Sequence, residues 1–75
     1  MFDKRRFMAQ LALKGVTLKE LAKNLEIDES TLYRKINDDG RFTRKEMNNM
    51  IDFLEIEDPN NIFFANELAY TQERD

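Results

Sequence analysis

Cysteine and histidine are both missing from this chain of 75 residues. Their absence excludes disulfide bonds and removes the thiolate and imidazole ligands of which zinc sites are built. A chain this short buries little apolar surface, so its elements must pack well, associate with another chain, or both. The absence of cysteine also fits a reducing compartment. The sequence therefore predicts one small domain without covalent or metal cross-links.

Long apolar runs are missing as well. No segment is long enough to span a membrane, and the first residues, Met1–Arg6, lack the apolar core of a signal peptide. We therefore expect a soluble, cytoplasmic protein that has no membrane partner.

The chain has neither histidine nor cysteine for catalysis, and its carboxylates alone point to no reaction. It contains no nucleophile elbow and no glycine-rich phosphate loop, so the sequence does not predict an enzyme or a bound cofactor. The run Asn37–Gly40, followed by Glu46, is similar to part of a calcium loop. Aligning its glycine with the loop glycine puts Lys35 at the first ligand position, where a carboxylate is needed. We therefore expect no metal ion.

Charge is unevenly distributed along the chain, whose net charge is −3. Residues 1–47 contain eleven basic and eight acidic residues, whereas residues 48–75 contain one basic and seven acidic residues. A modestly basic first part is compatible with nucleic-acid binding by one face. The same counts also fit ordinary solvated charges, so charge alone leaves both interpretations open.

Apolar spacing predicts a first helix over about residues 3–14, because Phe7 and Leu11 lie four positions apart on one face. Gly15 follows the last basic residue, where a left-handed C-cap is expected.

The second and third predicted helices follow each other with almost no loop between them. Thr17 and Glu20 form a capping box for the second, and Asp28 is an N-cap for the third, which we expect over Glu29–Asn37. Helices joined this tightly cross steeply and leave the start of the second one exposed, as in a helix-turn-helix. The apolar positions of this pair are Leu21, Ala22, Leu25, Ile27, Leu32 and Ile36.

Two more helices complete the predicted domain, residues 1–65. Thr43 and Glu46 form a second capping box, and Asp58–Pro59 is a favoured helix start. The fourth helix presents Met47, Met50 or Ile51, and Leu54, and the fifth presents Ile62, Phe63 and Phe64. We expect residues 66–75 to be a frayed tail. The predicted fold is all-α, a compact bundle of five short helices.

The pattern Gly15-x-Thr17-x-x-Glu20-Leu21-Ala22-x-x-Leu25-x-Ile27-Asp28-x-x-Thr31-Leu32-x-Arg34 resembles the Cro/C1-type helix-turn-helix of phage repressors. The later turn Phe42-Thr43 and the pair Leu54-x-Ile56 also fit that family. The run Ile62-Phe63-Phe64 is similar to small regulators of lysogeny modules. The resemblance covers about residues 5–64. It implies a lambda-repressor-like fold and a phage or prophage regulator that occupies operator DNA in a bacterial host.

The resemblance also implies which residues contact DNA. Base reading is implied for Glu29, Ser30, Thr31, Tyr33 and Arg34, and phosphate contact for Thr17, Leu18, Asn37, Arg41, Arg44 and Lys45. Arg34 suits guanine and Glu29 suits cytosine N4. A helix start is itself an anion site, which favours the last three phosphate-contacting residues. The alternative for those three is a solvated loop with ordinary charges.

Three positions depart from the family pattern. Leu18 replaces a frequent Gln, which removes a phosphate contact and a brace for the reading helix. Glu26 replaces the usual Gly of the turn, where a positive φ costs a side chain about 1 kcal/mol. Asp28 and Glu29 place negative charge at the start of the reading helix. Capping explains Asp28, whereas Glu29 must read a cytosine or repel the DNA backbone.

One such domain makes too few base contacts to define a unique site, so we expect a homodimer on a palindromic operator. The alternative is a modulator that binds a partner repressor through the acidic second half of the chain, with Ile62, Phe63 and Phe64 at the interface. Adjacent phenylalanines cannot both face the same core. One of them therefore covers a groove or meets another chain, unless both complete the edge of the core.

Overall fold

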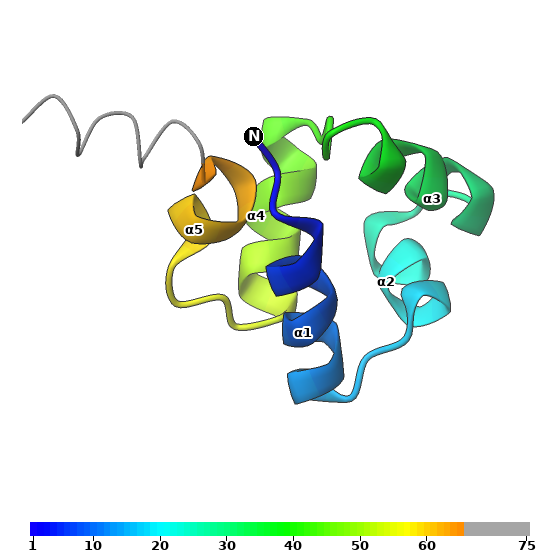
Figure 1. Cartoon of the computed structure of the whole chain (residues 1–75). Helices are drawn as coiled ribbons and strands as arrows, with labels where there is room; N and C mark the ends of the chain where they lie inside the picture. The colour runs from blue at the N-terminus through cyan, green and yellow to red at the C-terminus, as the bar shows by residue number, and fades with distance from the viewer. Residues whose placement is uncertain (66–75) are drawn as a thin grey trace, which may run out of the picture.

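Five helices form the fold of the computed structural model, which describes residues 1–65 (Figure 1). They are α1 (Lys4–Lys14), α2 (Leu18–Leu25), α3 (Glu29–Asn37), α4 (Arg44–Phe53) and α5 (Pro59–Phe63). No strand occurs in this part of the chain. The prediction of an all-α bundle of five short helices is confirmed. The predicted tail, residues 66–75, lies outside the described residues.

The helices begin at the capping residues that the sequence predicts. The Thr17 hydroxyl accepts a hydrogen bond from the Glu20 amide at 3.1 Å, and Glu20 Oε1 accepts one from the Thr17 amide at 2.9 Å. Thr43 and Glu46 repeat this capping box at 3.1 and 2.8 Å. Asp28 occupies the N-cap of α3, but its side chain makes no capping hydrogen bond. Asp58, the N-cap of α5, makes none either, so two of the four predicted N-caps act through their side chains.

Left-handed residues close α1 and α2. Gly15 ends α1 with a φ of +66°, as predicted. Glu26 ends α2 with a φ of +58°, a conformation that disfavours residues with a side chain. The following amide, that of Ile27, donates to the Ala22 carbonyl at 3.1 Å and so satisfies the helix end. This closure leaves a turn of three residues, Glu26–Asp28, between α2 and α3.

An aromatic cluster of four phenylalanines, Phe2, Phe7, Phe42 and Phe63, joins distant parts of the chain. Neighbouring ring centroids lie between 5.2 and 6.3 Å apart. The rings come from the segment before α1, from α1, from the loop before α4 and from α5. The other buried apolar residues are Leu11, Leu21, Ala22, Leu25, Leu32, Ile36, Met50, Leu54, Ile56 and Ile62. The prediction did not include Phe2 in the core.

The packing divides the molecule into two sides. α2 packs against both α3 and α4, whereas α1 packs against α5 (Figure 1). Residues 1–3 run beside the end of α5, where the Asp3 amide donates to the Ile62 carbonyl at 2.7 Å. Among the described helices, none is long and apolar enough to cross a membrane.

Candidate nucleic-acid interface

The exposed face of α3 is determined by its buried one. Leu32 and Ile36 lie four positions apart and are both buried against the core. Thr31, next to Leu32, is half-buried. The exposed residues of the same helix are Glu29, Ser30, Tyr33, Arg34 and Asn37, and 46% of the Tyr33 surface is exposed. Four of the five predicted base-reading residues are therefore exposed on one helix, and Thr31 lies at their edge.

The two charged residues of this face are free of ion pairs. Neither Arg34 nor Glu29 has an oppositely charged partner within 4.0 Å among residues 1–65. Glu29 lies in the first turn of α3, where the helix dipole favours a negative charge. The Arg34 guanidinium, one turn further on, keeps its donors available for an external acceptor.

The last residue of α3 and the loop that follows it carry two of the predicted phosphate contacts, Asn37 and Arg41. Asn37 Oδ1 accepts a hydrogen bond from Lys4 Nζ at 3.1 Å. Arg41 Nε lies 3.5 Å from Asp38 Oδ2, and both side chains are largely exposed. An exposed ion pair of this kind contributes little free energy, so Arg41 is held weakly in place. Its guanidinium can therefore exchange this partner for another anion.

The first turn of α4 is tied to α3 through Glu46. Its Oε1 accepts hydrogen bonds from the Thr43 amide at 2.8 Å and from Lys35 Nζ at 3.1 Å. Burial opposes ionisation of this carboxyl, but the hydrogen bonds from Thr43 and Lys35, with the charge of Lys35, outweigh it and lower its pKa. Arg44 and Lys45, in the same turn, are exposed and form no ion pair within residues 1–65. The turn that carries these two cations is thus tied to α3.

The start of α2 offers less to a phosphate than predicted. The Thr17 amide is occupied by the Glu20 carboxylate, and the hydrogen bonds from the Thr17 amide and hydroxyl lower the pKa of that carboxyl. The Leu18 side chain is half-buried and packs against the core. A phosphate contact at Leu18 is therefore limited to its backbone, and one at Thr17 requires the capping box to open.

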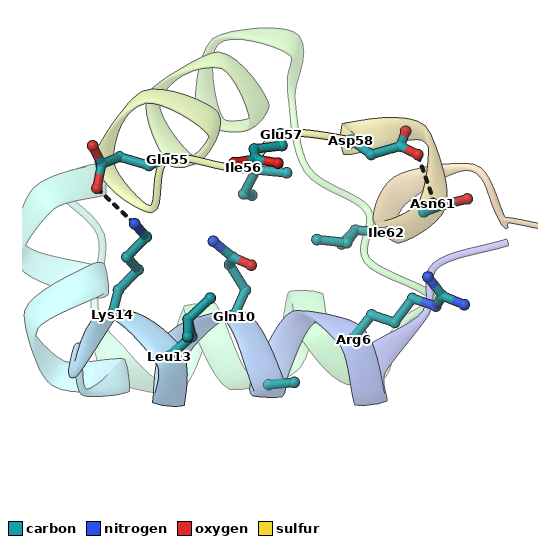
Figure 2. Close-up of a pocket in the computed structure, with 11 residues that line it drawn as sticks. Arg6, Gln10, Leu13, Lys14, Glu55, Ile56, Glu57, Asp58, Asn61 and Ile62 are labelled. Atoms are coloured by element: carbon teal, nitrogen blue, oxygen red, sulfur yellow. Dashed lines mark hydrogen bonds and ion pairs between the residues drawn. The ribbon is translucent and has the colours of Figure 1, made fainter.

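A groove of about 530 Å³ lies between α1 and the connection from α4 to α5 (Figure 2). Gln10 Nε2 donates to the Leu54 carbonyl at 2.7 Å, and Lys14 Nζ donates to Glu55 Oε1 at the same distance. This contact lowers the pKa of Glu55, through the hydrogen bond and the charge of Lys14. Leu13, on the wall formed by α1, is 75% exposed. No signal in the sequence predicted this groove, because its walls are distant in the chain.

Acidic residues line one wall of the groove without forming a metal site. They are Glu55, Glu57 and Asp58, and Asp58 Oδ2 accepts a hydrogen bond from Asn61 Nδ2 at 2.6 Å (Figure 2). Within residues 1–65, no group of three or more His, Cys, Asp or Glu side chains is placed to hold a metal ion. The carboxylates therefore give this wall negative charge, opposite the basic residues of α1.

Burial divides the predicted protein interface at the end of the domain. Ile62 and Phe63 are only 5% and 6% exposed and belong to the core, whereas Phe64 is 38% exposed. A short helix points adjacent side chains in different directions, so one phenylalanine enters the aromatic cluster and the other faces outward. The prediction is corrected accordingly. Ile62 and Phe63 are core residues, and Phe64 alone remains available to a partner.

Comparison with known proteins identifies no relative: no protein-family model, no curated protein and no solved structure matches the chain. The resemblance of residues 15–34 to the Cro/C1 type therefore stays a prediction. The candidate interface is defined by its own geometry, namely the exposed face of α3, the loop that follows it and the cations of α4.

Proposed function

We propose that this protein is a regulator of transcription that binds double-stranded DNA sequence-specifically and acts by occupying an operator. In this proposal α2 and α3 form a helix-turn-helix, with α3 in the major groove and α2 across the backbone. The observation that carries the proposal is the exposed polar face of α3. On this face Arg34 forms no ion pair within residues 1–65, and Lys35 of the same helix bonds to Glu46 in the first turn of α4. The groups proposed to read bases and to bind phosphates therefore lie on two helices that are bonded to each other.

Base reading is assigned to the exposed residues of α3. Arg34 would donate two hydrogen bonds to guanine O6 and N7, which discriminates against other bases by about 1–3 kcal/mol. Glu29 would accept a hydrogen bond from cytosine N4. Its negative charge would be repelled by a phosphate, which disfavours placing the start of α3 next to the DNA backbone. Ser30 donates or accepts, and Tyr33 contacts a thymine methyl or a phosphate.

Phosphate binding is assigned to the cations that follow α3. Arg44 and Lys45 are exposed at the start of α4, where the helix dipole adds to their attraction for an anion. Arg41 would exchange its weak pair with Asp38 for a phosphate oxygen. Each neutralised phosphate releases counterions and makes binding more salt-dependent. These contacts would fix the position of α3 on the duplex.

A homodimer would place two copies of α3 on a palindrome, and the groove along α1 suits the pairing of two copies. A two-fold contact requires that one surface carry both a protruding group and a recess for it. The exposed Leu13 and the groove beside it meet that condition. The walls carry opposite charge: α1 supplies Arg6 and Lys14, and the other wall supplies Glu55, Glu57 and Asp58, with Lys14 paired to Glu55 (Figure 2). Each basic wall would meet the acidic wall of the other copy.

The homodimer is tested by introducing a charge at position 13. Leu13→Lys removes the protruding apolar group at an exposed position, so the fold is expected to persist while self-association in sedimentation equilibrium is lost. Met8→Lys is the matched control, since Met8 is an exposed apolar residue of the same helix that does not line the groove. Equal association of both variants and the wild type would exclude this surface.

A second candidate function is modulation of a partner repressor, which the exposed Phe64 and the acidic wall of the groove favour. It requires no reading of DNA by α3. Phe64→Ala would then abolish binding to the partner protein, whereas Arg34→Ala would leave that binding intact.

Selection from random duplex DNA, followed by sequencing at low and moderate salt, tests the first function. We expect a palindrome to be enriched by the wild type and its base preference to be lost at one position per half-site in Arg34→Ala. Lys23→Ala is the control, because it removes an exposed cation of α2. Weak, salt-sensitive binding without enrichment would refute operator reading and favour the partner-binding function.

A further inference from the structure

The segment Met1–Lys4, here called the anchor segment, is bonded to the loop that follows α3. The Phe2 amide donates to Asp39 Oδ1 at 3.1 Å, and Lys4 Nζ donates to Asn37 Oδ1 at 3.1 Å. Asn37 ends α3, and Asp39 lies two residues further along the loop. The anchor segment therefore holds the stretch of chain that leads from α3 to the cations of α4.

The Phe2 side chain makes the same connection through packing. It is buried, and its ring lies 5.8 Å from that of Phe42, at the end of the loop. Gly40 lies directly beneath it, and a Cβ added there would overlap the Phe2 ring. Gly40 and Asp39 also have positive φ angles of +64° and +57°. A non-glycine residue is strained in that conformation, and the hydrogen bond from the Phe2 amide to Asp39 offsets part of the strain.

The anchor segment is itself held by α5. The Asp3 amide donates to the Ile62 carbonyl at 2.7 Å, and the Ala65 amide donates to the Met1 carbonyl at 3.0 Å. The Phe2 and Phe63 rings lie 6.0 Å apart. One short segment is thus fixed to α5 on one side and to the α3–α4 loop on the other.

We infer that the anchor segment is a positioning element of the nucleic-acid interface. It determines the loop conformation that places Arg41 and the first turn of α4 relative to α3. The functional part of this inference rests on the proposed DNA binding, whereas the structural part does not. Phe2 is buried and acts through the loop, so it serves as a positioning residue without touching DNA.

DNA binding by two core variants separates positioning from general stability. Phe2→Ala removes the ring that lies on Gly40, and Leu54→Ala truncates a buried residue at the end of α4, away from the loop. Both lower the thermal midpoint, so binding is measured at a temperature at which each is folded. We expect Phe2→Ala to weaken operator binding about tenfold and to reduce the slope of log K against log salt by about 0.9, the value of one phosphate. Leu54→Ala should leave the slope unchanged, and equal slopes for both variants would overturn the inference.

Two further measurements keep the outcome clear. If Phe2→Ala does not fold, Phe2→Leu keeps the apolar volume and removes the aromatic contact, with the same expected direction. Amide hydrogen exchange of residues 40–44, measured without DNA, should accelerate in the Phe2 variant more than in Leu54→Ala. If residues 40–44 exchange faster in the Phe2 variant but the wild-type protein binds no DNA, the structural role of the anchor segment stands and the proposed function is refuted. Unchanged exchange of these residues in the Phe2 variant would refute the structural role of the anchor segment.

Discussion

The side formed by α3 and the start of α4 differs from the side formed by α1 and α5 in how it uses its polar groups. On the second side they pair with one another, as Gln10 does with the Leu54 carbonyl and Lys14 with Glu55. On the first side Arg34, Arg44 and Lys45 are exposed, and no ion pair holds them within residues 1–65. These three cations are therefore available to an external acceptor, as the proposed DNA ligand requires.

The largest effect should come from the contact that joins the two sides. Gly40→Ala places a Cβ against the Phe2 ring in a left-handed conformation, so we expect a loss of about 3 kcal/mol or more in the free energy of unfolding. Gly15→Ala is a matched control, because its φ of +66° is similar but open space surrounds it. That variant should lose only about 1 kcal/mol. Urea unfolding measures both, and equal losses would show that Phe2 can move aside.

The two kinds of cation on the proposed DNA-binding side should respond differently to substitution. Arg44→Ala is expected to weaken binding to all duplexes and to reduce the salt slope by about 0.9. Arg34→Ala should instead lose about 1–3 kcal/mol of discrimination at one base pair. Competition binding with operator and unrelated DNA, at several salt concentrations, distinguishes the two. A loss of base preference in Arg44→Ala would reverse these assignments.

The turn between α2 and α3 offers a stabilising substitution. Glu26 has a φ of +58°, so Glu26→Gly should raise the free energy of unfolding by about 1 kcal/mol, because glycine adopts this conformation without strain. Lys23→Gly, inside α2, is the control and should lower it by a similar amount. Thermal unfolding checks both, and a destabilised Glu26→Gly would indicate that the carboxylate makes a favourable interaction of its own.

The smallest expected effect is the pH dependence of the link between α3 and α4. The pKa of Glu46 is lowered from its ordinary value of 4.5, so its ionised form stabilises the fold. That contribution is present above pH 4.5 and is lost as the pH falls through the lower folded value. Glu46→Gln should flatten the stability profile below pH 4.5 by less than about 1 kcal/mol. Urea unfolding at several pH values measures this, and parallel profiles would contradict it.

Local chemistry explains how much of the fold the sequence predicted. The capping boxes at Thr17 and Thr43 and the left-handed Gly15 depend on residues three or four positions apart, so the sequence displays them directly. The exposed face of α3 follows in the same way from the spacing of Leu32 and Ile36. The residues on the exposed face of α3 could therefore largely be predicted from the apolar periodicity.

Contacts between distant residues explain what the sequence did not predict. Phe2 bonds to a residue 37 positions away, and the groove is bridged by Gln10 across 44 positions. A phenylalanine before the first helix carries no periodic signal, so nothing marked Phe2 as a core residue. The sequence likewise could not tell which of Phe63 and Phe64 is buried, because that depends on how α5 packs beside α1.

The hydrogen bonds of Met1 and Asp3 to the end of α5 join two stretches separated by about sixty residues. Bringing such distant points together costs chain entropy before any contact compensates for it. We therefore expect this closure to form last during folding and to open first in native-state fluctuations. Hydrogen exchange at the Asp3 and Ala65 amides should then be faster than at Leu21. Equal protection would mean that the domain opens only as a whole. If the closure does open first, the protein folds its helices early and fixes the conformation of the α3–α4 loop in the final step.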